Sequence, residues 1–201
     1  MRIVLASKSP RRQEILRTLG LDFEVMNTGT EVPGFAPEDE PRREGESVRE
    51  YVLRTARDKA LRAFASLGSG RALVIAADTV VEKDGVLYGK PADREEEIAF
   101  LKAFSGATHT VRTALFVGTS PEDGLLAEET ARVTFRKLSS EEMRAYADSA
   151  EPYDKAGGYA IQGKAGAFVA SMQGTPSNVI GLPAGLLADM LAHFGVDLWR
   201  R

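Results

Sequence analysis

Apolar residues follow two kinds of pattern along the chain. Continuous apolar runs over 3–6 and 72–77 have the length of strands, and the second lacks polar alternation, as expected of a strand buried on both faces. Residues 48–67 and 178–194 repeat apolar positions at the spacing of an amphipathic helix, with Pro183 in the first turns of the later helix or at a break in it. The pattern therefore predicts a chain in which strands and helices alternate.

Shorter segments complete the predicted elements. Two β-rich runs over 108–119 and 126–135 predict a long hairpin, and Lys83-Asp84-Gly85 predicts a tight hairpin turn. Residues 27–46 are polar and rich in glycine, proline and acid, which predicts a loop of roughly twenty residues, a length that is usually functional or disordered. The other predicted elements are strands over 23–26 and 168–170 and helices over 10–19, 93–104 and 139–146.

The first predicted helix begins with a concentration of positive charge. Ser9 is expected at its N-cap and Pro10 at its first position, where the missing N–H group of proline costs nothing. Arg11 and Arg12 follow, although a helix N-terminus already carries about half a positive charge. Free N–H groups, the Ser7 hydroxyl and two guanidinium groups would suit a phosphate. A solubilising surface helix is the alternative, and this stretch alone leaves both interpretations open.

An acid and two lysines are the next candidates for chemistry. Asp78 is expected at the end of the buried run over 72–77, where an acid is costly unless it is hydrogen-bonded, binds a cation or acts as a base. A turn-capping aspartate is the alternative. The hairpin turn returns the chain so that Lys90 lies near Asp78. Lys59 borders the apolar stripe of its helix, either as an edge residue with its ammonium group in solvent or pointing into a cleft.

A glycine-rich segment lies near the end of the chain. Gly157, Gly158, Gly163 and Gly166 fall close together, which suits a backbone that passes close to a ligand, and the Gln162 amide can make a two-sided contact to a base edge. Glycine-rich loops are weak indicators individually.

Composition narrows the possible chemistry. The 201 residues are expected to form one domain, at most with two small lobes, and their net charge of −3 gives no bulk attraction to nucleic acid. The chain has no cysteine and two histidines, which excludes disulfides, thiolate catalysis, cysteine-ligated zinc and a histidine metal cage. We expect His109 to be a structural hydrogen-bonding residue. With no signal or membrane segment apparent, the protein is expected to be soluble and cytoplasmic.

The chain contains a series of short motifs spread over nearly its whole length. They are Leu5-Ala6-Ser7-Lys8-Ser9-Pro10-Arg11-Arg12, Ala77-Asp78-Thr79-Val80-Val81, Gly89-Lys90-Pro91, Ser105-Gly106-Ala107-Thr108-His109, Asp154-Lys155-Ala156-Gly157, Tyr159-Ala160-Ile161-Gln162-Gly163 and Gly181-Leu182-Pro183. In this order and spacing they resemble the motifs of the Maf (septum formation inhibitor) proteins. The resemblance implies an α/β fold of the inosine-triphosphatase-like (Maf/HAM1) type, with a mixed twisted sheet flanked by helices and two lobes around a central cleft. It implies one domain over 1–201 and a homodimer.

The resemblance also implies an activity. A Maf protein of this kind is a nucleoside triphosphate pyrophosphatase that uses a divalent cation, Mg²⁺ or Mn²⁺, and the glutamine of the Ile-Gln-Gly motif places this chain with the branch that prefers dTTP and UTP over 7-methyl-GTP. A nucleotide-binding regulator without catalysis is the competing function, and a nucleic-acid-binding module is disfavoured by the acidic balance. We expect Asp78 as proton acceptor and metal ligand with Glu40, Lys59 and Lys90 as further catalytic residues, and substrate contacts from Ser7, Arg11, Arg12, Thr79, Lys155 and Gln162.

The sequence departs from the family pattern at one place that matters. The family has an acid between the second strand and the second helix, and ungapped counting from the strand puts Val32 there. Counting back from the helix start selects Glu40, which is preferred as the second metal ligand, with Glu31 as second choice. Two minor departures have no clear consequence: Gly158, which stands where alanine is expected, and Arg112 in the first strand of the predicted long hairpin.

Overall fold

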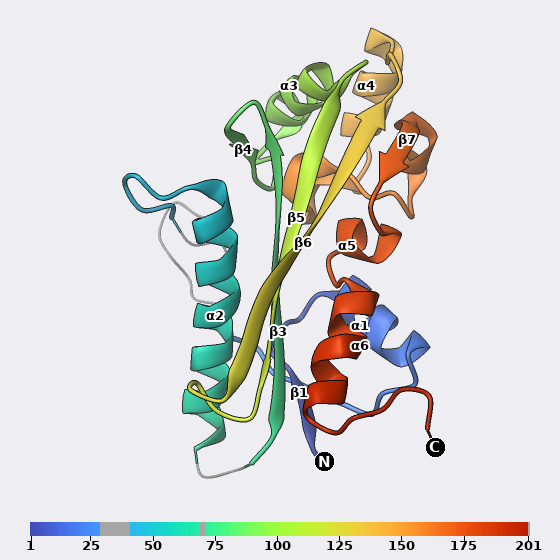
Figure 1. Ribbon diagram of the computed structural model, residues 1–201. Helices are drawn as coiled ribbons and strands as arrows, with labels where there is room; N and C mark the ends of the chain where they lie inside the picture. Colours follow the sequence, from blue (N-terminus) through green and yellow to red (C-terminus); the bar gives the residue numbers. More distant parts are fainter. Residues whose placement is uncertain (29–40, 69–70, 201) are drawn as a thin grey trace. The chain divides into compact units, whose positions relative to one another are not determined.

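The computed structural model describes residues 1–28, 41–68 and 71–200, and its strands form one seven-stranded mixed sheet (Figure 1). The strand order is β2-β1-β3-β5-β6-β7, with β4 paired to β3. Strand β1 runs parallel to β2 and β3, whereas β4 and β7 pair antiparallel with their neighbours. The strands are β1 (Ile3–Leu5), β2 (Glu24–Val25), β3 (Leu73–Lys83), β4 (Val86–Tyr88), β5 (Thr108–Gly118), β6 (Gly124–Phe135) and β7 (Val169–Gln173).

Helices flank the sheet, so the predicted mixed α/β architecture is confirmed. The α-helices are α1 (Pro10–Thr18), α2 (Val48–Leu67), α3 (Arg94–Phe104), α4 (Ser140–Ala147), α5 (Pro176–Ile180) and α6 (Ala184–His193). Three short 3-10 helices are η1 (Pro152–Asp154), η2 (Ala156–Gly158) and η3 (Lys164–Phe168).

The chain divides into two compact units. Unit 1 comprises 1–78, 113–129 and 181–201, and unit 2 comprises 79–112 and 130–180. Strands β3, β5 and β6 contribute residues to both units. Each unit has a hydrophobic core of its own.

In unit 1, helices cover both faces of the sheet. Along its part of β3, Leu73 and Ile75 pack into a core with residues of α1 and α6, whereas Val74 and Ala76 pack against α2 (Figure 1). This alternation is the period-two geometry of a strand, and burial on both faces explains why the run is apolar throughout. Helix α2 begins with the capping box that the pattern Ser47-Val48-Arg49-Glu50 predicts, because Ser47 and Glu50 exchange side-chain and backbone hydrogen bonds.

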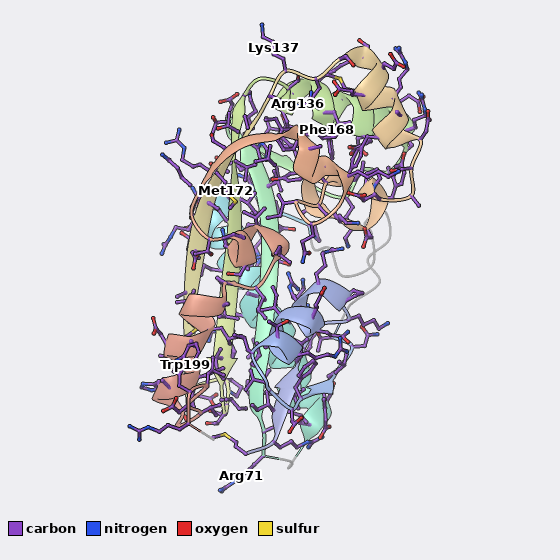
Figure 2. All side chains as sticks on the ribbon, turned by 90° about the vertical axis from the view of Figure 1, so that its right-hand side faces the viewer. Arg71, Arg136, Lys137, Phe168, Met172 and Trp199 are labelled. Carbon is purple, nitrogen blue, oxygen red and sulfur yellow. The ribbon has the colours of Figure 1, made fainter. Side chains whose placement is uncertain are left out.

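Unit 2 has a core rich in aromatic rings. The ring of His109 lies 4.3 Å from that of Phe104, and its Nε2 atom is 2.7 Å from the hydroxyl of Tyr159. Burial lowers the pKa of His109 to about 4, so the imidazole is neutral at pH 7 and has the structural role expected of it. At the outer side of this core the Arg136 guanidinium lies over the Phe168 ring, 5.8 Å from its centroid (Figure 2).

One prediction that was left open is decided, and another needs correction. Of the two places predicted for Pro183, the structure shows the break: α5 ends at Ile180, Gly181 has a φ of +117°, and Pro183 is the N-cap of α6. Strand β3 continues to Lys83, past the end predicted from the apolar run. Asp78 therefore lies within the strand, where it is the last residue of β3 that belongs to unit 1. The predicted hairpin turn after β3 is confirmed, because Asp84 and Gly85 both have positive φ, as a two-residue hairpin loop requires.

Candidate active site

The carboxylate of Asp78 is held by two side chains of α2. Strand alternation places Asp78 on the same face as Val74 and Ala76, which is the face that α2 covers. The Lys59 ammonium donates to Asp78 Oδ1 at 2.6 Å, and the Thr55 hydroxyl donates to Oδ2 at 2.7 Å. Lys59 is only 6% exposed. Of the two interpretations of Lys59, the structure therefore supports the inward-pointing one.

Thr55 is the residue of this cluster that sequence analysis missed. It lies one helical turn before Lys59, so the two side chains share a face of α2. Its hydroxyl is also 3.0 Å from the carbonyl oxygen of Tyr51, within hydrogen-bonding distance. The signal was available in the i, i+4 spacing to Lys59, but threonine within a helix is usually a packing residue.

Arg12 is built into unit 1 rather than displayed on its surface. It is 8% exposed, its Nε donates to the carbonyl oxygen of Gly181 at 2.8 Å, and an Nη1 hydrogen bond of 3.2 Å reaches the hydroxyl of Ser7. The backbone N–H of Ser9 donates to the same hydroxyl at 3.2 Å. These contacts fix the Ser7 side chain, which is itself buried. Arg11 is half-buried.

The N-terminus of α1 retains its partial positive charge, which favours the binding of an anion. Ser9 occupies the N-cap as predicted, but its side chain makes no capping hydrogen bond, and the first turn contains no acid. The partial positive charge of the helix start is therefore not offset by a side chain from its own turn. This arrangement suits a phosphate oxygen near Ser7.

Strand register brings the α1 turn and Asp78 to the same end of the unit 1 sheet. Leu5 pairs with Ile75 in parallel register, and the Ala6 N–H continues the ladder by donating to Ile75 O at 2.8 Å. Ser7 lies shortly after Leu5, beyond the end of β1, and Asp78 lies shortly after Ile75 within β3. The described residues of unit 1 thus place a buried hydroxyl, the uncapped start of α1, the cations of Arg12 and Lys59 and the Asp78 carboxylate in this part of the unit.

Unit 2 carries the other predicted site residues. The N–H of Gly157 donates to Gly89 O at 2.8 Å, which fixes the glycine-rich segment beside the residue that precedes Lys90. The Lys155 ammonium donates to the backbone carbonyl of Glu151 and to the Asp154 carboxylate. Lys155 is therefore tied to its own loop.

Two further predicted substrate-binding residues of unit 2 differ in exposure. Gln162 is exposed, and Thr79 is half-buried on β3.

The oxygen donors near Asp78 are compatible with the divalent cation that the family implies. Among described residues no group of three or more acids and histidines is gathered as a ready-made cage, and Glu40 and Glu31 lie outside those residues. In the structure, each carboxylate oxygen of Asp78 accepts one hydrogen bond, and each has a second lone pair. Because Mg²⁺ is commonly held by one or two carboxylates together with substrate phosphates, Asp78 fits a cation that binds with the nucleotide.

Arg54 of α2 anchors the described residues that directly precede this helix. Its guanidinium group donates to the Glu46 carboxylate at 2.6 and 2.9 Å and to the carbonyl oxygen of Pro41 at 3.2 Å. The hydrogen bond from Arg54 lowers the pKa of Glu46 to about 2. The start of this described segment is thus anchored to the helix that carries Lys59.

Two further features of the described residues bear on the site. A pocket of about 250 Å³ in unit 2 contains none of the predicted site residues and is lined by Thr108, Arg132, Thr134, Ser171 and Gln173. Within the same described ranges, no helix has both the length and the apolar character to span a membrane.

Comparison with known proteins assigns the chain to a family. A family model described as "Maf-like protein" matches residues 2–194. The chain belongs to the Maf-like proteins. This Maf-like chain is 45% identical over 201 residues to the dTTP/UTP pyrophosphatase of Bordetella avium (strain 197N), with 98% of this chain and 97% of that protein covered. It is 47% identical over 199 residues to the dTTP/UTP pyrophosphatase of Myxococcus xanthus (strain DK1622), with 98% and 95% covered.

Two solved structures are similar to the Maf-like chain at lower identity. The nucleoside-triphosphatase, or dITP/XTP pyrophosphatase, of Mycobacterium abscessus is 20% identical with a TM-score of 0.38, over 70% of this chain and 77% of that one. The Ham1 protein of Staphylococcus aureus is 14% identical with a TM-score of 0.41, over 67% and 72%. At TM-scores this low, the two likenesses add nothing to the assignment of the site.

Proposed function

We propose that this Maf-like protein is a nucleoside triphosphate pyrophosphatase that hydrolyses dTTP and UTP to the monophosphate and pyrophosphate. The observation that carries the proposal is the buried cluster of Asp78, Lys59 and Thr55 at the same sheet end as Ser7 and the uncapped start of α1. Its relatives from Bordetella avium and Myxococcus xanthus, at 45% and 47% identity, are dTTP/UTP pyrophosphatases by name.

Asp78 is assigned the role of proton acceptor. A water oxygen forms a bond to phosphorus, the α–β bridging P–O bond breaks, and the proton of the water passes to a carboxylate oxygen of Asp78. Lys59 and Thr55 fix the orientation of both carboxylate oxygens before substrate arrives. Little covalent work remains for the protein, because phosphoryl transfer depends mainly on positioning and on charge stabilisation.

The phosphates are assigned to the α1 turn. Ser7, Arg11 and the N–H groups of the first turn are proposed to hold phosphate oxygens, with Arg12 fixing Ser7 from behind. Asp78 and Glu40 are proposed to hold Mg²⁺ or Mn²⁺, which when bound screens the charge of the triphosphate.

Unit 2 is proposed to supply the remaining substrate contacts. Lys90 and Lys155 provide positive charge, and Thr79 and Gln162 select the base, with the Gln162 amide pairing with the pyrimidine edge. We further propose that the two units are lobes of a single domain, and that the protein acts as a cytoplasmic homodimer.

The variant Asp78→Asn tests the proposal. It keeps the size of the side chain and removes the proton acceptor, so pyrophosphate release from dTTP with Mg²⁺ should fall by at least about a thousandfold. Asp84→Asn, the same change in an exposed hairpin turn, is the matched control and should leave release unchanged. Wild-type rates in Asp78→Asn would overturn the assignment of Asp78. Saturable nucleotide binding by the wild type, without release under any divalent metal, would instead support a regulator.

A further inference from the structure

Two carboxyl groups fill the space beside two glycines in unit 2. Gly158 and Gly163 flank the segment 159–162, and Gly158 has a φ of +70°. A Cβ atom built on Gly158 would lie 1.7 Å from Oε2 of Glu97, and one built on Gly163 would lie 2.2 Å from Oε1 of Glu151. A side chain at either position would therefore collide with an acid. The Glu97 carboxyl group and the positive φ both favour glycine at position 158, where the family pattern has alanine.

Burial of the Glu97 carboxyl group is energetically unfavourable. It projects from α3, is 0% exposed, and neither carboxyl oxygen has a hydrogen-bond partner among the described residues. Burial raises its pKa to about 9, so the group is a neutral acid at pH 7. A leucine or methionine at this position of α3 would avoid the cost of burying a polar group. Packing alone does not account for a carboxyl group here.

Glu151 is held firmly from two sides. The Tyr146 hydroxyl donates to its Oε1 at 3.1 Å, and the backbone N–H of Lys164 donates to its Oε2 at 3.1 Å. Its own carbonyl oxygen accepts from the Lys155 ammonium. Glu151 thus ties α4 to the backbone immediately after Gly163 and also to Lys155.

We propose that Glu97 and Glu151 are positioning residues that hold the two ends of segment 159–162 and thereby set the place where the exposed Gln162 amide meets the nucleotide base. Glu97 packs on Gly158 at one end, and Glu151 bonds the turn at Gly163 and Lys164 at the other. With only four residues between the two fixed ends, the segment has little freedom to shift. The proposal rests on the proposed function, because it needs Gln162 to read the base.

The first test compares Glu151→Ala with Glu151→Gln. Glutamine can accept from the Lys164 N–H and donate to the Tyr146 oxygen, so it restores both contacts, whereas alanine removes them. In Glu151→Ala, KM for dTTP and UTP should rise about tenfold, kcat should change little, and the preference over CTP should shrink accordingly. Glu151→Gln should return both values to near those of the wild type. Tyr146→Phe removes one contact without a cavity and serves as second variant if Glu151→Ala does not fold.

The second test is a double-mutant cycle on Gly158 and Glu97. Gly158→Ala adds a methyl group against the Glu97 carboxyl and should lower the preference for dTTP over CTP, and adding Glu97→Ala should restore much of it. Glu95→Gln on the exposed side of α3 is the control and should change nothing.

The outcomes separate the two hypotheses. If the wild type releases no pyrophosphate from any nucleoside triphosphate, the proposed function fails. If the wild type is selective but Glu151→Ala, Tyr146→Phe and Gly158→Ala all retain its selectivity, the positioning role fails while the proposed function stands. Wild-type selectivity in Glu97→Ala, the remaining single variant of the cycle, would likewise overturn the role of Glu97.

Discussion

Lys59 of α2 and Asp78 of β3 form an ion pair of 2.6 Å in which both side chains are largely buried. Breaking such a pair by removing one partner leaves an uncompensated charge in the interior. Lys59→Met should therefore destabilise the protein by about 3 kcal/mol and slow pyrophosphate release by about tenfold to a hundredfold. Urea denaturation and a pyrophosphate assay measure the two effects. Lys137→Met, at an exposed position, is the control, and equal stability of the two variants would contradict the importance of the pair.

Thr55→Val tests the hydroxyl that sequence analysis missed. Valine keeps the shape and removes the donor to Asp78 Oδ2, so kcat should fall about tenfold with little change in KM. Stability should change by no more than about 1 kcal/mol, because one hydrogen bond is lost. Thr55→Ser should recover most of kcat. An unchanged kcat in Thr55→Val would show that the hydroxyl has no part in orienting the acid.

Arg12→Lys should be damaging despite the conserved charge. The lysine ammonium cannot span Gly181 O and the Ser7 hydroxyl as the guanidinium does. We expect a loss of about 2 kcal/mol of stability and a KM for dTTP raised about tenfold. Arg17→Lys on the same helix is exposed and should be neutral. Wild-type values for Arg12→Lys would mean that the bridge does not fix Ser7.

Glu97 makes stability depend on pH in a predictable direction. Its pKa is about 9 in the folded protein and 4.5 as an ordinary glutamate, so the folded state binds more protons between these values and loses stability as pH rises through them. Glu97→Gln should lack this loss, and its advantage over the wild type should grow by up to about 1.4 kcal/mol per pH unit. The titratable groups facing Glu97 from α4 and η1 are Tyr146 and Tyr153, whose pKa values are raised above their usual range, mainly by burial.

Urea denaturation at pH 5, 7 and 8.5 measures the difference between Glu97→Gln and the wild type. Glu95→Gln is the exposed control, and its difference from the wild type should stay constant with pH. Parallel behaviour of Glu97→Gln and Glu95→Gln would contradict a buried, neutral Glu97.

Local patterns predicted the elements of this fold well, because caps, turns and apolar spacing act between near neighbours. The capping box at Ser47 and the hairpin turn at Asp84 and Gly85 were correct for this reason. The direction of Lys59 was ambiguous from α2 alone. It is decided by β3, whose alternation turns Asp78 toward that helix.

Contacts between distant segments limited the prediction of the site. The role of Arg12 depends on Gly181, and the need for glycine at 158 depends on Glu97, neither of which has any local signature in the sequence. The α6 start at Pro183 was likewise undecided, because proline suits both a first turn and a break. The acid expected at Glu40 lies outside the described residues, so it stays a prediction.

The hydrogen bond from Arg12 to Gly181 joins residues 169 positions apart. A contact of such long range closes a very large loop, and its entropic cost is recovered only when the sheet between the two segments has formed. Ser7 leaves the ribosome long before Gly181, the residue that holds Arg12 and through it the Ser7 hydroxyl. The phosphate side of the site is therefore expected to mature late in folding, so that a nascent chain carries its phosphate-binding sequence long before it can use it.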